Sequence, residues 1–305
     1  MNRFFSLPVV AGILGGVLFP YQSLNLVWAA SILLFFLLLF NVLEVDVLSA
    51  LSALRGTGKL TALRLALLFG FFPVLQTVAA SLVLTDRDHI FGVAMASLAP
   101  PALVVPMFLR RRGGNVAGGV SIVVLATLLY PLLLVPMIHM LGFSAIYIDT
   151  RALFLYLTLL TVAPVLCAMV FSLLLPRMKL TLLKHVAVLN SLVLGLLMFI
   201  LVGSALNHVP LRTWRSENAV WLTVLLLWMD FGVYFLLRWT WDKDSAILLS
   251  CRNFAIPASL LLFFDPKAAL APAIGLVVHA VFFQWLMFKE KASSVAGDAR
   301  AIRNE

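Results

Sequence analysis

Charged residues are scarce in this sequence, and their scarcity excludes a water-soluble fold. Only 11% of the 305 residues are charged, whereas 63% are hydrophobic, and the mean hydropathy is +1.08. No soluble fold of this size can bury so much apolar surface. Apolar runs of about 20 residues follow one another, and this is the length of an α-helix that crosses a bilayer. The sequence therefore predicts an all-α, polytopic membrane protein.

Other absences exclude classes of function. The two cysteines, Cys167 and Cys251, both fall in apolar runs, so no disulfide framework is indicated. The sequence has no Ser/His/Asp, paired-carboxylate or His/Cys metal arrangement at useful spacing, so we expect neither an enzyme nor a bound cofactor or metal ion. It also has no Walker-type phosphate loop, which argues against ATP-driven transport by this chain alone.

We expect ten membrane spans in one transmembrane domain, residues 1–288. The predicted spans are residues 5–21, 24–44, 61–84, 90–109, 116–140, 151–175, 185–206, 219–239, 245–264 and 270–288. With both termini in the cytoplasm, sixteen Lys and Arg residues lie on the cytoplasmic side and five on the other, as the positive-inside rule requires. This asymmetry accounts for most of the net charge of +9 without a nucleic-acid partner. We expect the plasma membrane, or the inner membrane of a bacterium, as the location.

Two polar segments lie outside the predicted spans. Arg110, Arg111 and Arg112 follow the fourth span, and we interpret them as a topological anchor that can also bind anionic lipid head groups. Residues 289–305 are small, polar and charged, and they are expected to form a disordered cytoplasmic tail.

The loop lengths indicate an inverted duplication of residues 1–140 and 151–288. In each half the loop between the second and third spans is long, the next has five residues, and the following one is short. The first loops of the two halves do not match. Because five spans is an odd number, two such halves are inverted relative to one another. Inverted repeats are common in secondary transporters, whose substrate sites lie near the midplane where interrupted helices meet.

The fourth spans of both halves contain helix-breaking features. Three prolines within seven residues free carbonyl groups in the first of them. The second carries Arg252 shortly before Pro257. An arginine inside a span costs roughly 2.5–3.5 kcal/mol on insertion scales, so it normally faces a partner or a water-filled cavity. We therefore predict a substrate site where the breaks meet; the alternative is that the prolines merely kink packed helices. The residues predicted there are Pro100, Pro101, Pro106, Cys251, Arg252 and Asn253.

Two stretches of the sequence resemble the bile acid:sodium symporter superfamily. They are Leu98-Ala99-Pro100-Pro101 with Gly114-Asn115-Val116-Ala117 in the fourth-helix region, and Cys251-Arg252-Asn253 in the ninth span. The resemblance extends to the ten-span plan, as for a divergent bacterial-type member. It implies two inverted five-helix repeats forming a panel and a core domain, with helices 4 and 9 crossing at their breaks. It also implies transport of organic anions such as bile acids, steroid sulfates or pantothenate-like acids, usually with sodium.

The sequence departs from this family where the family binds sodium. At the positions that we align with the family's ligands, this chain has Val105 and Pro106, Gly119 and Val123, and Leu248 and Arg252. Valine and leucine offer no side-chain oxygen to a hard cation. We infer that the Arg252 guanidinium replaces the bound cation, donates to freed carbonyls of the fourth-span break and attracts an anionic substrate. We therefore expect transport without sodium. The alternative is a structural arginine paired with an acid.

Further polar side chains lie within predicted spans. Asp230 is a candidate counter-ion for Arg252 or a proton carrier, with a role in coupling; the alternative is a carboxylate facing a watery vestibule. Gln76, Asn190 and His279 are candidate substrate contacts, although such residues more often form interhelical hydrogen bonds.

The sequence as a whole favours a secondary transporter of a small organic anion. A non-transporting membrane sensor or interaction protein on the same fold is the alternative, because the ion ligands are missing. A metalloid or auxin-type efflux carrier is a third interpretation.

Overall fold

The computed structural model describes residues 2–45, 52, 58–102, 104–143, 149–208 and 217–303. In these ranges the regular elements are α-helices and two π-helices, so the prediction of a helical protein is confirmed. Six of the described helical segments are long and apolar enough to cross a membrane. They are Gly58–Val83, Val116–Met140, Arg151–Leu174, Val186–His208, Val220–Thr240 and Leu270–Phe288.

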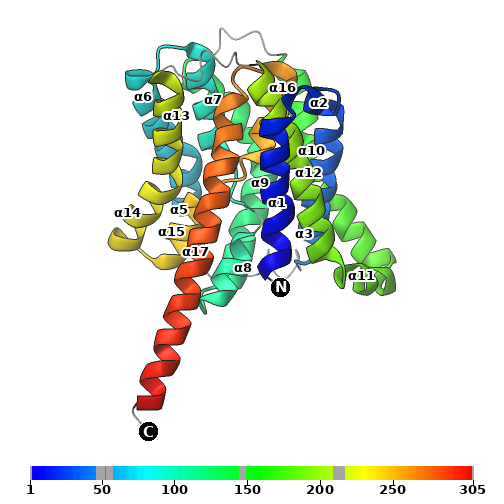
Figure 1. Ribbon diagram of the computed structural model, residues 1–305, viewed down its shortest axis with the longest axis vertical. Helices are drawn as coiled ribbons and strands as arrows, with labels where there is room; N and C mark the ends of the chain where they lie inside the picture. Colours follow the sequence, from blue (N-terminus) through cyan, green and yellow to red (C-terminus); the bar gives the residue numbers. More distant parts are fainter. Residues whose placement is uncertain are drawn as a thin grey trace.

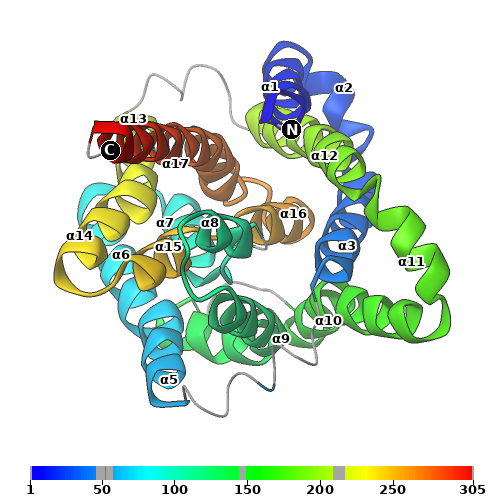
Figure 2. The same cartoon turned by 90° about the horizontal axis from the view of Figure 1, so that it is seen from below.

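One group of helices forms a curved layer, seen on the right of Figure 2. Its members are α1 (Asn2–Leu18), α2 (Pro20–Leu24), α3 (Val27–Leu43), α10 (Thr150–Leu174), α11 (Pro176–Leu183) and α12 (Val186–His208). Helix α1 packs along α12, and α3 packs between α12 and α10. We call this group the first layer.

Glycines allow α1 and α12 to approach each other closely. A Cβ atom added at Gly12 would lie 2.0 Å from the carbonyl oxygen of Gly195, and one added at Gly16 would lie 3.0 Å from the amide nitrogen of Gly203. Small residues at such contacts let helix backbones pack in a bilayer, where van der Waals contact rather than the hydrophobic effect drives association. The first layer therefore depends on backbone-to-backbone packing.

The remaining helices form a second group. Its outer members are α5 (Gly58–Ala66), η2 (Leu67–Phe71), α6 (Phe72–Val83), α9 (Val116–Met140), α13 (Glu217–Leu227), η4 (Trp228–Gly232), α14 (Val233–Thr240) and α17 (Leu270–Arg303). Two broken pairs complete it: α7 (Arg87–Leu98) with α8 (Val105–Arg111), and α15 (Lys243–Ser250) with α16 (Ala255–Phe264). Figure 2 shows α7, α8 and α15 inside this group, and α16 facing the first layer.

Breaks occur inside two of the predicted spans, as expected. The fourth predicted span divides into α7 and α8, and the ninth into α15 and α16. A π-helix lies within the third predicted span of each half, η2 in the first and η4 in the second. In the tail the structure differs from the prediction, because the backbone of α17 is helical through Arg303. Alanine, lysine, glutamate and arginine, which are good helix formers, are frequent after Phe288 and account for this continuation.

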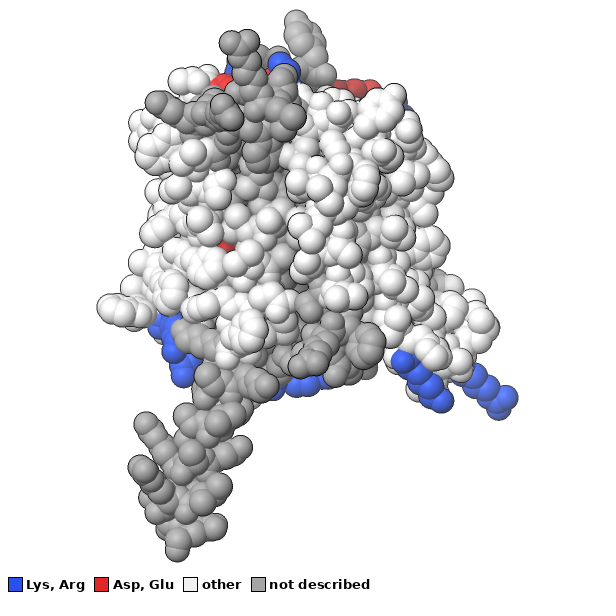
Figure 3. Space-filling model, viewed as in Figure 1, with Lys and Arg blue, Asp and Glu red and all other residues white. Residues whose placement is uncertain are grey.

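The surface charge is distributed unevenly along the long axis. Figure 1 places the start of α1 and the end of α17 at the same, lower end of the molecule. Figure 3 shows Lys and Arg gathered at that end and mostly uncharged surface between the two ends. At the upper end, acidic and basic residues both occur.

Candidate functional site

The two helix breaks pair with each other. The amide of Ala102 donates to the carbonyl of Cys251 at 2.8 Å, and the amide of Asn253 donates to the carbonyl of Pro100 at 2.8 Å. Pro101 and Arg252 form the antiparallel bridge between these two hydrogen bonds. Residues at such a non-hydrogen-bonded position do not use their own amide, so a proline is tolerated there. The breaks therefore meet in a register that suits the Pro-Pro sequence.

The side chain of Arg252 is buried at this crossing and binds two backbone carbonyls. It is 1% exposed, and its Nη1 lies 3.1 Å from the oxygen of Ala99 and 3.1 Å from that of Leu68. Ala99 caps the end of α7, so the predicted donation to a freed carbonyl of the fourth-span break is confirmed.

The carbonyl of Leu68 lacks its helical amide donor, and the sequence explains why. In η2 the amide of Phe72 bonds to the carbonyl of Leu67, five residues earlier. The next amide, which would continue this pattern to Leu68, belongs to Pro73 and has no hydrogen. Sequence reasoning missed Leu68, although Pro73 after an apolar stretch is the signal that could have found it.

Solvent does not reach the guanidinium in this conformation. Of the two environments expected for Arg252, a partner or a water-filled cavity, its almost fully buried side chain has the partner, in the form of the two carbonyls. Its Nη2 has no hydrogen-bond partner among the described residues. The crossing thus contains a buried cation with two carbonyl acceptors and one unused donor group.

Asp230 pairs with His279 and not with Arg252 among the described residues. The carboxylate Oδ2 lies 3.0 Å from Nδ1 of His279, and Asp230 is 0% exposed. Asp230 belongs to η4, and His279 belongs to α17. Arg252 still acts on Asp230 through its charge, without a direct hydrogen bond. The partner of Asp230 is thus His279, which the sequence analysis had assigned to substrate contact, and not Arg252 as predicted.

The other predicted residues are only partly brought together. Cys251 is buried at the crossing, with its sulfur 3.8 Å from the Ser250 hydroxyl. Pro106 lies in the first turn of α8, where a missing amide is tolerated. Gln76 is buried in α6, and its Oε1 has no partner in the described part of the chain.

Asn190 lies in the first layer rather than at the crossing. Its Nδ2 donates to Oδ1 of Asn41 at 3.3 Å, which joins α12 to α3. This is the interhelical hydrogen bond that was the alternative to a substrate contact.

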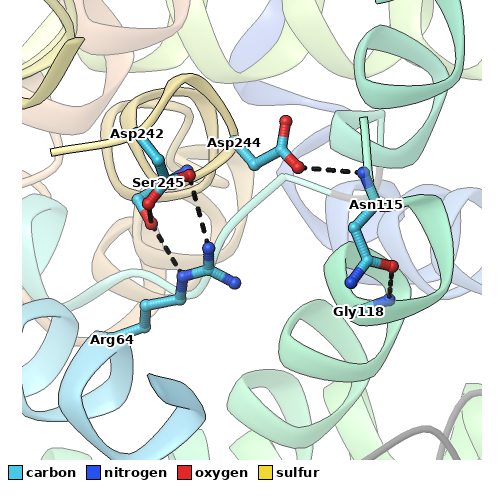
Figure 4. A network of polar contacts seen from close by, with 6 residues as sticks. All are labelled: Arg64, Asn115, Gly118, Asp242, Asp244 and Ser245. Atoms are coloured by element: carbon cyan, nitrogen blue, oxygen red, sulfur yellow. Dashed lines mark hydrogen bonds and ion pairs between the residues drawn. The ribbon is translucent and has the colours of Figure 1, made fainter. Parts of the chain in front are cut away.

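A polar network that the sequence analysis missed holds the start of α15 (Figure 4). Arg64 of α5 is 7% exposed, and its Nε donates to the Ser245 hydroxyl at 2.7 Å. Its Nη2 lies 3.4 Å from Oδ1 of Asp242. Asp242 caps α15 by accepting from the Ser245 amide at 2.7 Å. Burial raises the pKa of the Asp242 carboxyl, but the hydrogen bonds from Ser245 and the charge of Arg64 outweigh burial and lower that pKa overall.

The same turn of α15 is tied to α9. Oδ2 of Asp244 accepts from the Asn115 amide at 2.9 Å, and Oδ1 of Asn115 accepts from the Gly118 amide at 2.9 Å. A Cβ atom at Gly114 would lie 2.4 Å from Oδ1 of Asp244, so glycine leaves room for the carboxylate here. These contacts fix α15, and through it the break that carries Arg252.

Tyr156 connects the two groups of helices. Its hydroxyl pairs with the Ser31 hydroxyl of α3 and lies 3.5 Å from the Ser259 hydroxyl of α16. Tyr156 itself belongs to α10. The helix that follows the Arg252 break therefore contacts the first layer through a hydroxyl chain as well as through apolar packing.

Comparison with known proteins adds no relative to this description. No protein-family model matches the sequence, and no curated protein matches it. The resemblance to the bile acid:sodium symporter superfamily therefore stays a prediction.

Proposed function

We propose that this chain is a secondary transporter of small organic anions. The observation that carries the proposal is the buried Arg252 guanidinium at the paired breaks of two helices. Irregular backbone at membrane depth is tolerated where protein buries it or where it lines a cavity, and in transporters such breaks form substrate sites. The proposal includes the ten-span inverted repeat, with both termini in the cytoplasm of the plasma or bacterial inner membrane.

The chemistry of the crossing favours an anion. A guanidinium stays charged in proteins and presents five donors, of which the two on Nη2 are unused within the described part of the chain. A carboxylate or sulfonate is the natural partner for such a fork. Binding would require Arg252 to become accessible in another conformation.

Sodium is not needed in this scheme. The carbonyl oxygens of Ala99 and Leu68 are the kind of ligand that sodium would use, and Arg252 already donates to both. The arginine therefore supplies the positive charge in place of a bound ion. We propose that transport is independent of sodium.

Counterflow of labelled taurocholate and pantothenate in proteoliposomes tests the proposal. We expect equal exchange in sodium and choline buffers. Arg252→Gln is expected to weaken anion binding roughly 10- to 150-fold, because a hydrogen bond to a charged group contributes about 1.5–3 kcal/mol. Arg252→Lys keeps the charge and is expected to lose less. Arg151→Gln, at the exposed start of α10, is the matched control. Strong sodium dependence would refute the built-in cation.

The sealed state of Arg252 favours a second candidate, a membrane sensor or interaction protein on the same fold. In that case the guanidinium is structural, and the hydrogen bonds to Ala99 and Leu68 are its whole role. Absence of counterflow across a broad panel of carboxylates and sulfonates, with intact protein, would favour the sensor over the transporter.

Membrane lipids are the second class of partner that we propose. Helix α11 has no buried residue, and its Met178 and Leu180 are 57% and 65% exposed beside Arg177 and Lys179. Exposed apolar side chains beside basic residues suit the interface with anionic head groups. Accessibility of single cysteines placed at 178 and at the chain termini would test whether they share the cytoplasmic side.

A further inference from the structure

Asp230 and His279 form a buried acid–base pair in which each partner has an unused atom. Oδ2 of Asp230 and Nδ1 of His279 are 3.0 Å apart. Oδ1 of Asp230 and Nε2 of His279 have no hydrogen-bond partner in the described part of the chain. When Nδ1 carries the hydrogen and donates to the carboxylate, both unused atoms hold lone pairs. The pair therefore offers two positions at which one additional proton can bind.

Among the described residues, few charged or titratable groups act on this pair. For Asp230 they are His279 from α17 and Arg252 from the break, with the Cys251 thiol beside the arginine. Tyr234, in the helix that continues η4, accepts hydrogen bonds from Arg112 at 3.0 Å and from Arg238 at 3.2 Å. Aromatic rings also pack against the imidazole, those of Phe254, Phe282 and Phe283. Arg252 is the arginine that acts on Asp230 through its charge.

The imidazole also touches the break that carries Arg252. The ring of His279 lies edge-on to that of Phe254, with centroids 5.4 Å apart, and 4.0 Å from that of Phe283. Phe254 is the N-cap residue of α16, two positions after Arg252. A change in the charge or hydrogen bonding of His279 therefore acts directly on Phe254, next to the break that carries Arg252.

The charges of these three side chains link proton binding to anion binding. Asp230 as carboxylate, His279 as neutral imidazole and Arg252 as guanidinium sum to zero. An added proton makes the sum positive by one charge, and a monovalent anion returns it to zero. Because an unbalanced charge is costly in a medium of low dielectric constant, each of the two ligands favours the other. By linkage this effect is reciprocal.

We propose that Asp230 and His279 together bind one proton, and that this proton moves with one monovalent anion held at Arg252. The inference rests on the proposed transport function and names its coupling ion. The loaded and empty sites carry the same charge, so the cycle is electroneutral. Uptake should therefore follow a pH gradient and be insensitive to membrane potential.

The affinity of the wild-type protein for taurocholate and pantothenate, measured against pH, is the first test. On the alkaline side of the titration, the Kd is expected to rise about tenfold for each pH unit, as one linked proton requires. In proteoliposomes an inward pH gradient should drive accumulation, and a potassium diffusion potential with valinomycin should not. Asp230→Asn and His279→Gln are expected to make the affinity independent of pH. His139→Gln, an exposed histidine in α9, should keep the wild-type pH dependence.

A measurement without any anion keeps the inference testable by itself. Infrared difference spectra of the purified wild-type protein, recorded as the pH is lowered from about 8 to 5, should show protonation of a carboxyl or imidazole that disappears in the Asp230→Asn, His279→Gln double variant. Identical spectra in the two proteins would overturn the proton site. Counterflow with a pH-independent Kd would overturn the coupling but leave the transport function standing. Loss of counterflow in the wild type would overturn the transport function instead.

Discussion

The close approach of α1 and α12 gives a prediction whose size can be worked out from the structure. In Gly12→Ala the new Cβ would lie 2.0 Å from the carbonyl oxygen of Gly195, whereas ordinary contact begins near 3.4 Å. Both sides of this contact are helix backbone, so neither can turn away. The two helices must separate by about 1.4 Å, the difference between these distances. A gap of that order forfeits a large part of the van der Waals attraction along the contact.

The expected net loss of stability is about 2 kcal/mol. Overpacking of this kind costs typically 1–3 kcal/mol, and a rigid backbone contact belongs near the upper end. The higher helix propensity of alanine offsets about 1 kcal/mol of this loss. At roughly 2–4 °C for each kcal/mol, the thermal midpoint in detergent should fall by about 4–8 °C. Tryptophan fluorescence during heating, in one detergent and at one pH, measures this shift.

Gly15→Ala is the matched control on the same helix. Its Cβ would lie 3.2 Å from the ring of Phe199, which is a side chain and can adjust. The stability of this variant should stay within about 1 kcal/mol of the wild type or rise, because helix propensity dominates. If Gly12→Ala melts no lower than Gly15→Ala, the backbone contact does not stabilise the first layer and the reasoning is refuted.

Three further predictions concern polar groups. The pKa of Asp242 is lowered in the folded protein, so its carboxylate stabilises the fold above about pH 4. This stabilisation is lost as the pH falls through the folded pKa. Asp242→Asn should therefore have a lower melting temperature at neutral pH, and that temperature should fall less in acid than the melting temperature of the wild type. Arg64→Met should cost roughly 1.5–3 kcal/mol in thermal unfolding, with Arg64→Lys closer to the wild type, because the buried bond to Ser245 is lost. Asn190→Leu should lower the stability by only about 0.6 kcal/mol and leave taurocholate binding unchanged, since the partner of Asn190 is Asn41. Weaker taurocholate binding by this variant would show that Asn190 belongs to the substrate site.

The helix breaks could be predicted from the sequence because their causes are local. Pro100 and Pro101 cannot continue a helix, and Arg252 is too costly in an apolar run to be incidental. The pairing of the breaks could not be predicted in register, because the hydrogen bonds between 100–102 and 251–253 join residues about 150 positions apart. The partner of Asp230 was missed for the same reason, since no local pattern links η4 to His279.

Local chemistry also explains what a closer reading of the sequence could have found. Pro73 removes the amide that would satisfy Leu68, so the free carbonyl beside Arg252 is encoded by one residue. Asp242, with Ser245 three residues later, is the sequence signal for the start of α15 and explains the cap. It does not predict the contact with Arg64, which belongs to another helix. Caps and prolines act within one turn of the chain, whereas ion pairs between helices depend on tertiary packing.

Under the proposed inverted repeat, the chemistry lies where the two halves differ. Pro101 and Arg252 occupy the same position of the antiparallel bridge, and a proline follows each of them five residues later. The third residue of each π-helix is Phe69 in one half and Asp230 in the other. The frame of breaks and π-helices is therefore common to both halves, while the cation and the carboxylate occur only in the second. The proposed ligand binding gives a reason for both buried charges, because each is costly in a bilayer and neither recurs at the equivalent position of the first half.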